Sequence, residues 1–175
     1  IDDIFLKVHA YKWHEMPEIL DGGDRWAYGT DMAYMRELCA YWVDKFDWRK
    51  AESLLNSFSQ FIATVEGQDI HFIHVKGSGT NPETLLMTHG WPGSVFEFYG
   101  VIERLAHPER FGGDAEEGLT LVIPSLPGYG FSGRPKRPIG PRATARLWDK
   151  LMRSVLGYRD YIAQGGDWGS AVSGW

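Results

Sequence analysis

Apolar residues in the first third of the chain recur at the spacing of an amphipathic helix. This pattern predicts two helices, over about 31–46 and 48–57, the first capped by Thr30 or Asp31 and the second by Asp47. We interpret their apolar faces as packing surface. Residues 1–30 show weak periodicity and carry many aromatic side chains, so we expect an irregular arm laid over a larger body.

The pattern changes near residue 60, where short runs with strand character begin. The expected strands are 61–66 and 70–75, which form a hairpin joined through Gly67-Gln68-Asp69, and the buried runs 84–88, 119–123 and 161–164. Helices are expected over 95–106 (Phe96, Tyr99, Val101, Ile102 and Leu105 apolar), over 141–156 (Ala145, Leu147, Trp148, Leu151, Met152 and Val155 inward) and over 170–175. Buried strands that alternate with helices are typical of an α/β fold whose later strands run parallel. We therefore predict a leader domain over residues 1–60 and a core domain over residues 61–175.

The composition is that of a globular protein of 175 residues with a net charge of −5. No long basic block points to nucleic acid, and no apolar run approaches the ~20 residues of a transmembrane helix. Cys39 is the single cysteine, which favours a reducing compartment, and we interpret it as a buried small hydrophobic residue. Because no signal peptide is visible, we expect a cytoplasmic protein.

Two histidines in the expected hairpin raise the question of a metal site. His71 and His74 lie three residues apart on one strand, so their side chains should point to opposite faces of the sheet. They are therefore a poor pair of metal ligands. We interpret both as structural histidines with satisfied hydrogen bonds.

The last expected strand ends in Gly165-Gly166-Asp167-Trp168-Gly169, where a sharp turn leads into a helix. This is the pattern of a nucleophile elbow, in which small neighbours let strand and helix approach each other around the nucleophile. The usual nucleophile is serine, which needs a base, whereas the carboxylate of Asp167 is already ionised near neutral pH. A carboxylate suits displacement at a saturated carbon and gives a covalent ester. The alternative is an aspartate in an exposed turn or at a helix N-cap.

The expected strand over residues 84–88 ends in a second turn, His89-Gly90-Trp91-Pro92. Ligands of open α/β sheets bind at this edge. In an elbow fold, one oxyanion-hole N–H follows the nucleophile and the other comes from this strand-to-helix loop. Those donors would be the backbone N–H groups of Trp168 and Trp91. The alternative is a simple tight turn, but both turns occur in the context and order that the elbow requires.

At this point the chain resembles the epoxide hydrolases of the microsomal and juvenile-hormone type, a branch of the α/β-hydrolase fold. The segments that carry the resemblance are Thr88-His89-Gly90-Trp91-Pro92-Gly93-Ser94, Gly165-Gly166-Asp167-Trp168-Gly169-Ser170, Phe46-Asp47-Trp48-Arg49, Leu55-Asn56, His71-Phe72-Ile73-His74 and Pro124-Ser125-Leu126-Pro127-Gly128-Tyr129-Gly130-Phe131-Ser132. They extend over essentially the whole chain. The leader is the most specific part, because haloalkane dehalogenases also have aspartate elbows but lack such a leader.

The resemblance implies that Asp167 attacks an epoxide carbon and forms an ester with the ring-opened substrate. The N–H groups of Trp91 and Trp168 would stabilise the oxyanion when water hydrolyses the ester to a vicinal diol. His89, Gly90 and Pro92 would belong to the motif beside the substrate. Neither a metal nor an organic cofactor is implied.

The resemblance also implies parts that the sequence does not contain. In this fold the acid and the histidine that activate water follow the nucleophile in the chain, yet all six histidines precede Asp167. The lid tyrosines of the family also lie beyond the elbow. The elbow strand, central in a complete sheet, would here be an exposed apolar edge. We therefore expect the first half of a sheet, which works with the C-terminal half of the enzyme in cis or as a second chain and is not a competent catalyst alone.

Two other functions remain open from the sequence. Another hydrolase with an aspartate nucleophile, such as a haloalkane dehalogenase, would release halide and form no diol. A non-catalytic truncated module would keep the fold without the second half of the site.

Overall fold

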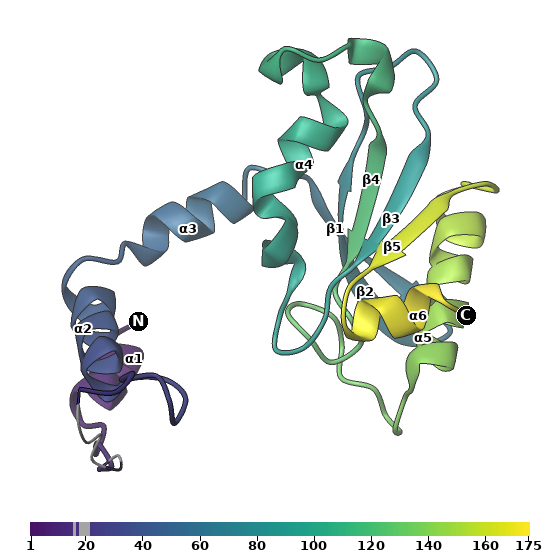
Figure 1. Cartoon of the computed structure of the whole chain (residues 1–175). Coiled ribbons are helices and arrows are strands. Elements are labelled where there is room, and N and C mark those ends of the chain that lie inside the picture. The colour runs from purple at the N-terminus through teal and green to yellow at the C-terminus, as the bar shows by residue number, and fades with distance from the viewer. Residues whose placement is uncertain (16, 18–21) are drawn as a thin grey trace. The chain divides into compact units, whose positions relative to one another are not determined.

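The described strands form one sheet in the order β1-β2-β4-β3-β5 (Figure 1). Their bounds are Gln60–Val65 (β1), Gln68–Val75 (β2), Thr84–Thr88 (β3), Thr120–Pro124 (β4) and Ile162–Gly165 (β5). The first two strands pair antiparallel, as do β2 and β4, whereas β3 runs parallel to both β4 and β5. This computed structural model describes residues 1–15, 17 and 22–175, in two units, Ile1–Ala51 and Glu52–Trp175, and the sheet belongs to the second unit.

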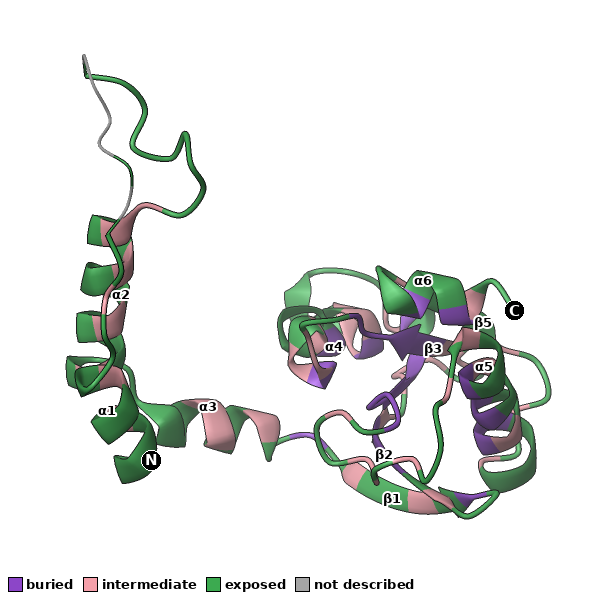
Figure 2. Cartoon of the chain, turned by 90° about the horizontal axis from the view of Figure 1, so that it is seen from below, coloured by how far each residue is buried: buried purple, intermediate pink, exposed green. Residues whose placement is uncertain are grey.

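Helices cover both faces of the sheet, and each face has its own core. The helix α4 (Tyr99–Ala106), preceded by the 3₁₀ turn η1 (Val95–Phe98), covers one face, and η2 (Pro108–Phe111) and η3 (Ala115–Glu117) follow it. The other face carries α5 (Pro141–Lys150), its π-helical continuation η4 (Leu151–Val155) and α6 (Trp168–Ser173). Figure 2 shows the buried residues gathered on the central strands and on the helix faces turned towards them.

Successive side chains along each strand point to opposite faces of the sheet, so the buried ones belong to two different cores. Leu86 and Val122 pack with Trp148 and Leu151 on the α5 side, whereas Met87, Leu121 and Ile123 pack with Ile102 on the α4 side. Successive residues of a strand point to opposite faces, and runs without polar residues are expected where both faces are covered. The predicted α/β fold class is therefore confirmed.

Several expectations about the elements are wrong in detail. The arm over residues 1–30 is not wholly irregular, because Asp2–His9 forms the helix α1. The hairpin turn is tighter than expected: Glu66 and Gly67 have φ of 51° and 79°, and Gln68 and Asp69 already belong to β2. Val155 was expected inward, but it is 48 % exposed, because the helix widens into a π-helical turn at Leu151 and the facing positions shift.

The helix over residues 95–106 is also less buried than its pattern predicts. It begins as a 3₁₀ turn, so its first residues follow a different period from the α-helix. Ile102 is fully buried, whereas Tyr99 and Val101 are exposed. The short final helix begins at Trp168, two residues before the expected start.

The first unit contains α1, α2 (Met32–Asp44) and the start of α3 (Trp48–Leu55), which continues into the second unit. The side chain of Asp31 accepts a hydrogen bond from the Tyr34 N–H at 2.8 Å and caps α2. None of the described residues of α1 and α2 is buried, and Cys39 is half-buried rather than buried. Apolar side chains of this unit line a groove of about 560 Å³; they are Ile1, Ile4, Phe5, Leu38, Tyr41, Trp42, Phe46 and Trp48.

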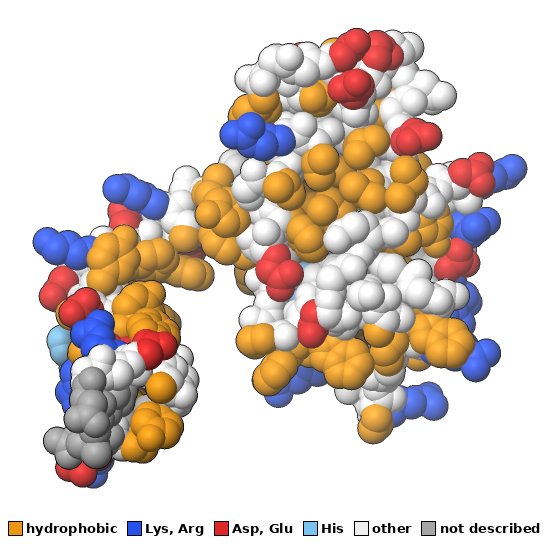
Figure 3. Space-filling view, viewed as in Figure 1, with side chains coloured by type: hydrophobic (Ala, Val, Ile, Leu, Met, Phe, Trp, Pro, Cys, Tyr) orange, Lys and Arg blue, Asp and Glu red, His pale blue; other side chains and the backbone are white. Residues whose placement is uncertain are grey.

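The strand β5, which leads into the elbow, lies at one edge of the sheet and pairs only with β3. Ile162 at its start is 49 % exposed, and three of its four residues are exposed. Figure 3 shows hydrophobic side chains gathered on the face of the second unit on which β5 lies in Figure 1. The strand that carries the elbow is thus the least covered strand of the sheet.

Candidate active site

Asp167 lies with Gly166 between a strand and a helix, in a backbone conformation that few residues adopt. β5 ends at Gly165, α6 begins at Trp168, and Asp167 has φ 52° and ψ −124°. Positive φ brings Cβ of an L-residue against its own backbone, and such a residue costs of order 1–3 kcal/mol. The strain projects the carboxylate out of the turn, where Asp167 is exposed to solvent.

Two glycines of the elbow stand where no side chain fits. A Cβ on Gly165 would lie 2.2 Å from the carbonyl carbon and oxygen of Gly169. A Cβ on Gly169 would lie 2.0 Å from the carbonyl oxygen of Thr88 in β3. Gly166 differs, because no atom lies within 4 Å of the position of its Cβ. The close approach of α6 to β3 and β5 therefore depends on Gly165 and Gly169.

The register of the sheet brings the two predicted turns together. β3 and β5 run parallel, with Thr88 opposite Gly165, so both strands end at the same level. The segment after β3 begins with His89 and the segment after β5 contains Asp167. Trp91 and Asp167 consequently meet although they are far apart in the sequence.

Two backbone N–H groups act on the carboxylate of Asp167. The N–H of Trp91 donates to Oδ1 at 2.8 Å, and the N–H of the adjacent Trp168 adds to the stabilisation of the charged form. The bond from Trp91, followed by that from Trp168, lowers the pKa of Asp167, and burial opposes this only weakly. Hydrogen bonds to the charged form stabilise the carboxylate, so Asp167 is ionised at neutral pH.

Asp167 can approach the loop after β3 because Gly90 has no side chain. A Cβ on Gly90 would lie 2.6 Å from Cβ and 2.7 Å from Oδ1 of Asp167. Pro92 follows a cis peptide bond after Trp91. The indole rings of Trp91 and Trp168 are 64 % and 50 % exposed, so both residues reach the site through their backbone and present apolar rings to the solvent beside it.

His89 begins the loop after β3, but its side chain is buried and does not reach the surface of the site. It is fully buried, and no hydrogen bond joins it to Asp167 within the described structure. Nδ1 lies 2.9 Å from the Gly90 carbonyl oxygen, and Nε2 accepts a hydrogen bond from the Leu126 N–H at 3.0 Å. Burial lowers the pKa of His89, so its ring is neutral.

The other two histidines of the sheet also have polar partners. Nδ1 of His71 lies 2.9 Å from Ser125 Oγ and Nε2 lies 2.8 Å from Gln60 Oε1. Nε2 of His74 lies 2.9 Å from Tyr158 Oη. Both rings therefore have hydrogen-bond partners, as expected, and their structural role stays a prediction. Within residues 1–15, 17 and 22–175, no group of three or more His, Cys, Asp or Glu side chains could hold a metal ion.

The lowered pKa values of these histidines predict how the free energy of unfolding changes with pH. Burial lowers the pKa of His71, His74 and His89 from the ordinary value of 6.5. Below that value the unfolded chain binds more protons than the folded chain, so the free energy of unfolding rises with pH across the window between the lowered and the ordinary pKa. Each unit by which one pKa is lowered removes about 1.4 kcal/mol at the acidic end of the window.

Urea denaturation across this range should therefore give a constant free energy of unfolding above neutral pH. The value should fall as the pH drops through 6.5 and level off below the lowered pKa values. A free energy of unfolding that does not change over the same range would contradict the neutral, buried state of these rings.

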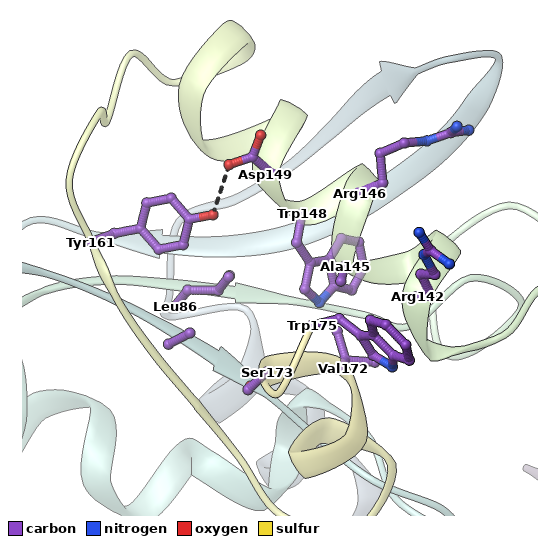
Figure 4. A pocket seen from close by; sticks show the side chains of 11 residues that line it. Leu86, Arg142, Ala145, Arg146, Trp148, Asp149, Tyr161, Val172, Ser173 and Trp175 are labelled. Carbon is purple, nitrogen blue, oxygen red and sulfur yellow. Dashed lines mark hydrogen bonds between the residues drawn. The ribbon is translucent and has the colours of Figure 1, made fainter.

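Two of the hollows in the second unit border α6, and Asp167 lines neither of them. The larger, of about 390 Å³, lies between α5, β5 and α6 (Figure 4). In it the hydroxyl of Tyr161 donates to Asp149 at 3.2 Å, and Arg142 lies 5.2 Å from the centre of the Trp175 ring. The smaller, of about 230 Å³, is bordered by Trp168, Leu126 and Tyr129. The described residues therefore leave the carboxylate on an open surface.

Comparison with known protein families shows to which family this chain belongs. The family model described as "Epoxide hydrolase N terminus" matches residues 1–98 of the 175. The chain belongs to the epoxide hydrolase family. A second model, described as "alpha/beta hydrolase fold", matches residues 83–175 and confirms the predicted fold, with a helical leader before the first part of its sheet.

Known epoxide hydrolases resemble this chain along almost its whole length. A putative epoxide hydrolase of Stigmatella aurantiaca is 39 % identical over 99 % of this chain and 38 % of its own length, and the rabbit (Oryctolagus cuniculus) epoxide hydrolase 1 is 44 % identical over 85 % and 33 %. The solved structure of the Aspergillus niger epoxide hydrolase superposes with a TM-score of 0.83 and 34 % identity, over 98 % of this chain and 44 % of that chain. The chain thus spans about a third of the length of the curated relatives that it matches. No helix among the described residues is long and apolar enough to cross a membrane.

Sequence reasoning missed one contributor to the site of this epoxide hydrolase chain. The N–H of Leu126, in the loop after β4, holds the imidazole of His89. A backbone group has no residue type by which a sequence could reveal it. The only signal was the position of this loop at the same sheet edge as the two turns.

Proposed function

We propose that this chain supplies the nucleophile and the oxyanion hole of an enzyme that hydrolyses epoxides to vicinal diols. The observation that carries the proposal is the hydrogen bond of 2.8 Å from the Trp91 N–H to Oδ1 of Asp167 at a strained elbow. It leaves the carboxylate ionised, exposed and oriented by donors from two loops. The family match over the leader supports an epoxide as the substrate.

In the first step the carboxylate opens the ring. With Oδ1 held by the Trp91 N–H, Oδ2 of Asp167 attacks one epoxide carbon. A new C–O bond forms, the old C–O bond breaks, and its electron pair stays on the epoxide oxygen, which takes a proton from solvent or from an acid elsewhere in the enzyme. The product is an ester between Asp167 and the ring-opened substrate.

In the second step water adds to the carbonyl carbon of this ester. The negative charge develops on Oδ1, at which the Trp91 N–H already points, so this donor needs no reorganisation to stabilise it, and the N–H of the adjacent Trp168 is the second donor in this proposal. Collapse of the tetrahedral intermediate releases the diol and restores the carboxylate. One proton of the water ends on the released diol oxygen, and the other is returned through the base to solvent, which balances the proton that the epoxide oxygen took up in the first step. No metal or organic cofactor takes part in either step.

The second step needs a base that activates water, and we propose that the remainder of the enzyme supplies it, in cis or as a second chain. The described histidines do not serve, because none hydrogen bonds to Asp167 and those of the sheet are held by other partners. The same remainder would supply the acid for the epoxide oxygen and the cover of the site.

Intact-mass spectrometry after exposure to styrene oxide tests this proposal. We expect the mass of the chain to rise by one epoxide, with the adduct on Asp167, and the adduct to persist because deacylation lacks its base. A parallel sample with a haloalkane distinguishes the second candidate, a dehalogenase-like hydrolase, which would release halide. A folded sample that forms neither an adduct nor a diol with the epoxide would contradict the proposal and favour a non-catalytic module.

A further inference from the structure

The peptide between Gly90 and Trp91 carries two groups that point in opposite directions. Because the peptide bond is planar and trans, the Gly90 carbonyl and the Trp91 N–H lie in one rigid plane and point to opposite sides of the C–N bond. Whatever fixes the carbonyl therefore also fixes the N–H. In the structure the Gly90 oxygen accepts from His89 Nδ1 at 2.9 Å and from the Gly93 N–H at 3.1 Å, while the Trp91 N–H donates to Asp167.

We propose that His89 is a positioning residue, which holds the Gly90 carbonyl so that the Trp91 N–H points at the carboxylate of Asp167. The catalytic consequence rests on the proposed function, since it requires Trp91 to be an oxyanion donor. The orientation itself does not rest on it and can be measured without any substrate.

The partners of the ring allow only one tautomer. The Leu126 N–H can only donate, so Nε2 of His89 must be unprotonated. The Gly90 carbonyl can only accept, so Nδ1 must carry the proton. Protonation of Nε2 would place two donors against each other. The ring therefore acts as a neutral bridge between the loop after β4 and the loop after β3.

The far end of this bridge is itself fixed. The neighbour of Leu126, Ser125, donates its N–H to the His71 carbonyl at 2.8 Å, and its Oγ lies 2.9 Å from His71 Nδ1. The Ser132 hydroxyl donates to the Ser125 carbonyl at 2.7 Å. The Leu126 N–H thus has little freedom to follow a displaced imidazole. These hydrogen bonds tie the loop after β4 to β2. Through His89 they therefore also fix the loop after β3, which carries Trp91.

His89 has no direct route to the substrate. Its side chain is fully buried, and the ring of Tyr129 covers it edge-on with ring centres 5.5 Å apart. It therefore does not transfer a proton to a reacting atom. What it contributes is the direction of one N–H group.

Two substitutions separate the two hydrogen bonds of the ring. The amide of His89→Asn places a donor where Nδ1 stood, so it can still hold the Gly90 carbonyl, whereas the longer His89→Gln reaches the place of Nε2 and loses that bond. By amide NMR of the 175-residue chain, we expect the Trp91 N–H of His89→Gln to shift upfield and to exchange with solvent roughly tenfold faster. The Trp168 N–H should change little, and His89→Asn should keep the Trp91 signal near that of the wild type.

The catalytic readout is the hydrolysis of the Asp167 ester by hydroxide under mildly alkaline conditions, after labelling with styrene oxide. Loss of one oxyanion donor slows such a step by about 10²–10³-fold in enzymes, so we expect a loss of at least roughly tenfold in His89→Gln and a much smaller one in His89→Asn. His74→Ala, which removes the bond to Tyr158 at a distance from the loop, controls for loss of stability alone.

Three results would overturn the proposal. The first is an unchanged Trp91 N–H in folded His89→Gln, and the second is an equal effect of His89→Asn and His89→Gln on that signal. The third needs no variant: ¹⁵N NMR of the wild-type ring that showed the proton on Nε2. If no ester forms at all, the proposed function fails, while the Trp91 signal still decides the role of His89.

Discussion

Replacing Asp167 with asparagine should abolish covalent labelling of the chain by styrene oxide, with a rate at least ~10³-fold lower. A neutral amide oxygen is a far weaker nucleophile than a carboxylate, and nucleophilic catalysis depends on the activated form. The substitution keeps the shape of the side chain, and its oxygen can still accept from the N–H groups of Trp91 and Trp168. The effect should therefore appear in the adduct measured by intact mass, and the fold should be retained.

The matched control is Asp160→Asn, which removes an exposed carboxylate in the turn before β5. It should label at the rate of the wild type. Equal labelling of Asp167→Asn and the wild type, or an adduct that maps to another carboxylate, would show that the elbow is not the nucleophile. Near-UV circular dichroism of both variants verifies that the comparison is made between folded proteins.

Adding one methyl group at Gly165 or Gly169 should destabilise the second unit more than any exposed substitution, by about 3 kcal/mol or more. Overpacking of a filled interior commonly costs about 1–3 kcal/mol, and here the methyl group meets backbone atoms, which cannot rotate away. The new Cβ would lie 2.2 Å from Gly169 atoms in the first case and 2.0 Å from the Thr88 oxygen in the second. Urea denaturation of Gly165→Ala and Gly169→Ala measures the loss.

Gly166→Ala provides the control within the same turn. No atom lies within 4 Å of its Cβ position, so we expect a change within about 1 kcal/mol, and a loss of freedom in the unfolded chain even favours the alanine. If Gly166→Ala destabilised the protein as much as Gly165→Ala, close approach between strand and helix would not explain the glycines of the elbow.

The buried strands were the most predictable elements, because their pattern has a single physical cause. The run Thr84–Thr88 was predicted with its observed bounds, since its apolar residues supply both cores of a sheet covered on two faces. The helix Asp2–His9 was missed, because it buries no residue and has no side-chain cap, and those two features are what sequence reasoning looks for. The exposure of Val155 was missed because a π-helical turn breaks the period on which the prediction depended.

For the candidate site, the sequence indicated which residues meet but not how they are held. The two turns lie at the ends of neighbouring parallel strands, and the register that puts Thr88 opposite Gly165 brings Trp91 and Asp167 together. The roles of Asp167, Trp91 and Trp168 in catalysis stay predictions. The function of the His89 imidazole could not be inferred, because its partners are backbone groups of Gly90 and Leu126, whose positions depend on the folded loops.

The positive φ of Asp167 lowers the stability of the folded chain, although the carboxylate at this position is the group that we propose to react. Glycine adopts such a conformation without steric cost, so a glycine at this position would relieve strain of order 1–3 kcal/mol, more than the roughly 0.5–1 kcal/mol that its extra freedom in the unfolded chain removes. The carboxylate is kept at a position where a residue without a side chain would make the protein more stable. We therefore expect screens that select only for thermostability to enrich glycine at this position, and a stabilised variant of this chain should be sequenced at Asp167 before a loss of covalent labelling is attributed to rigidity.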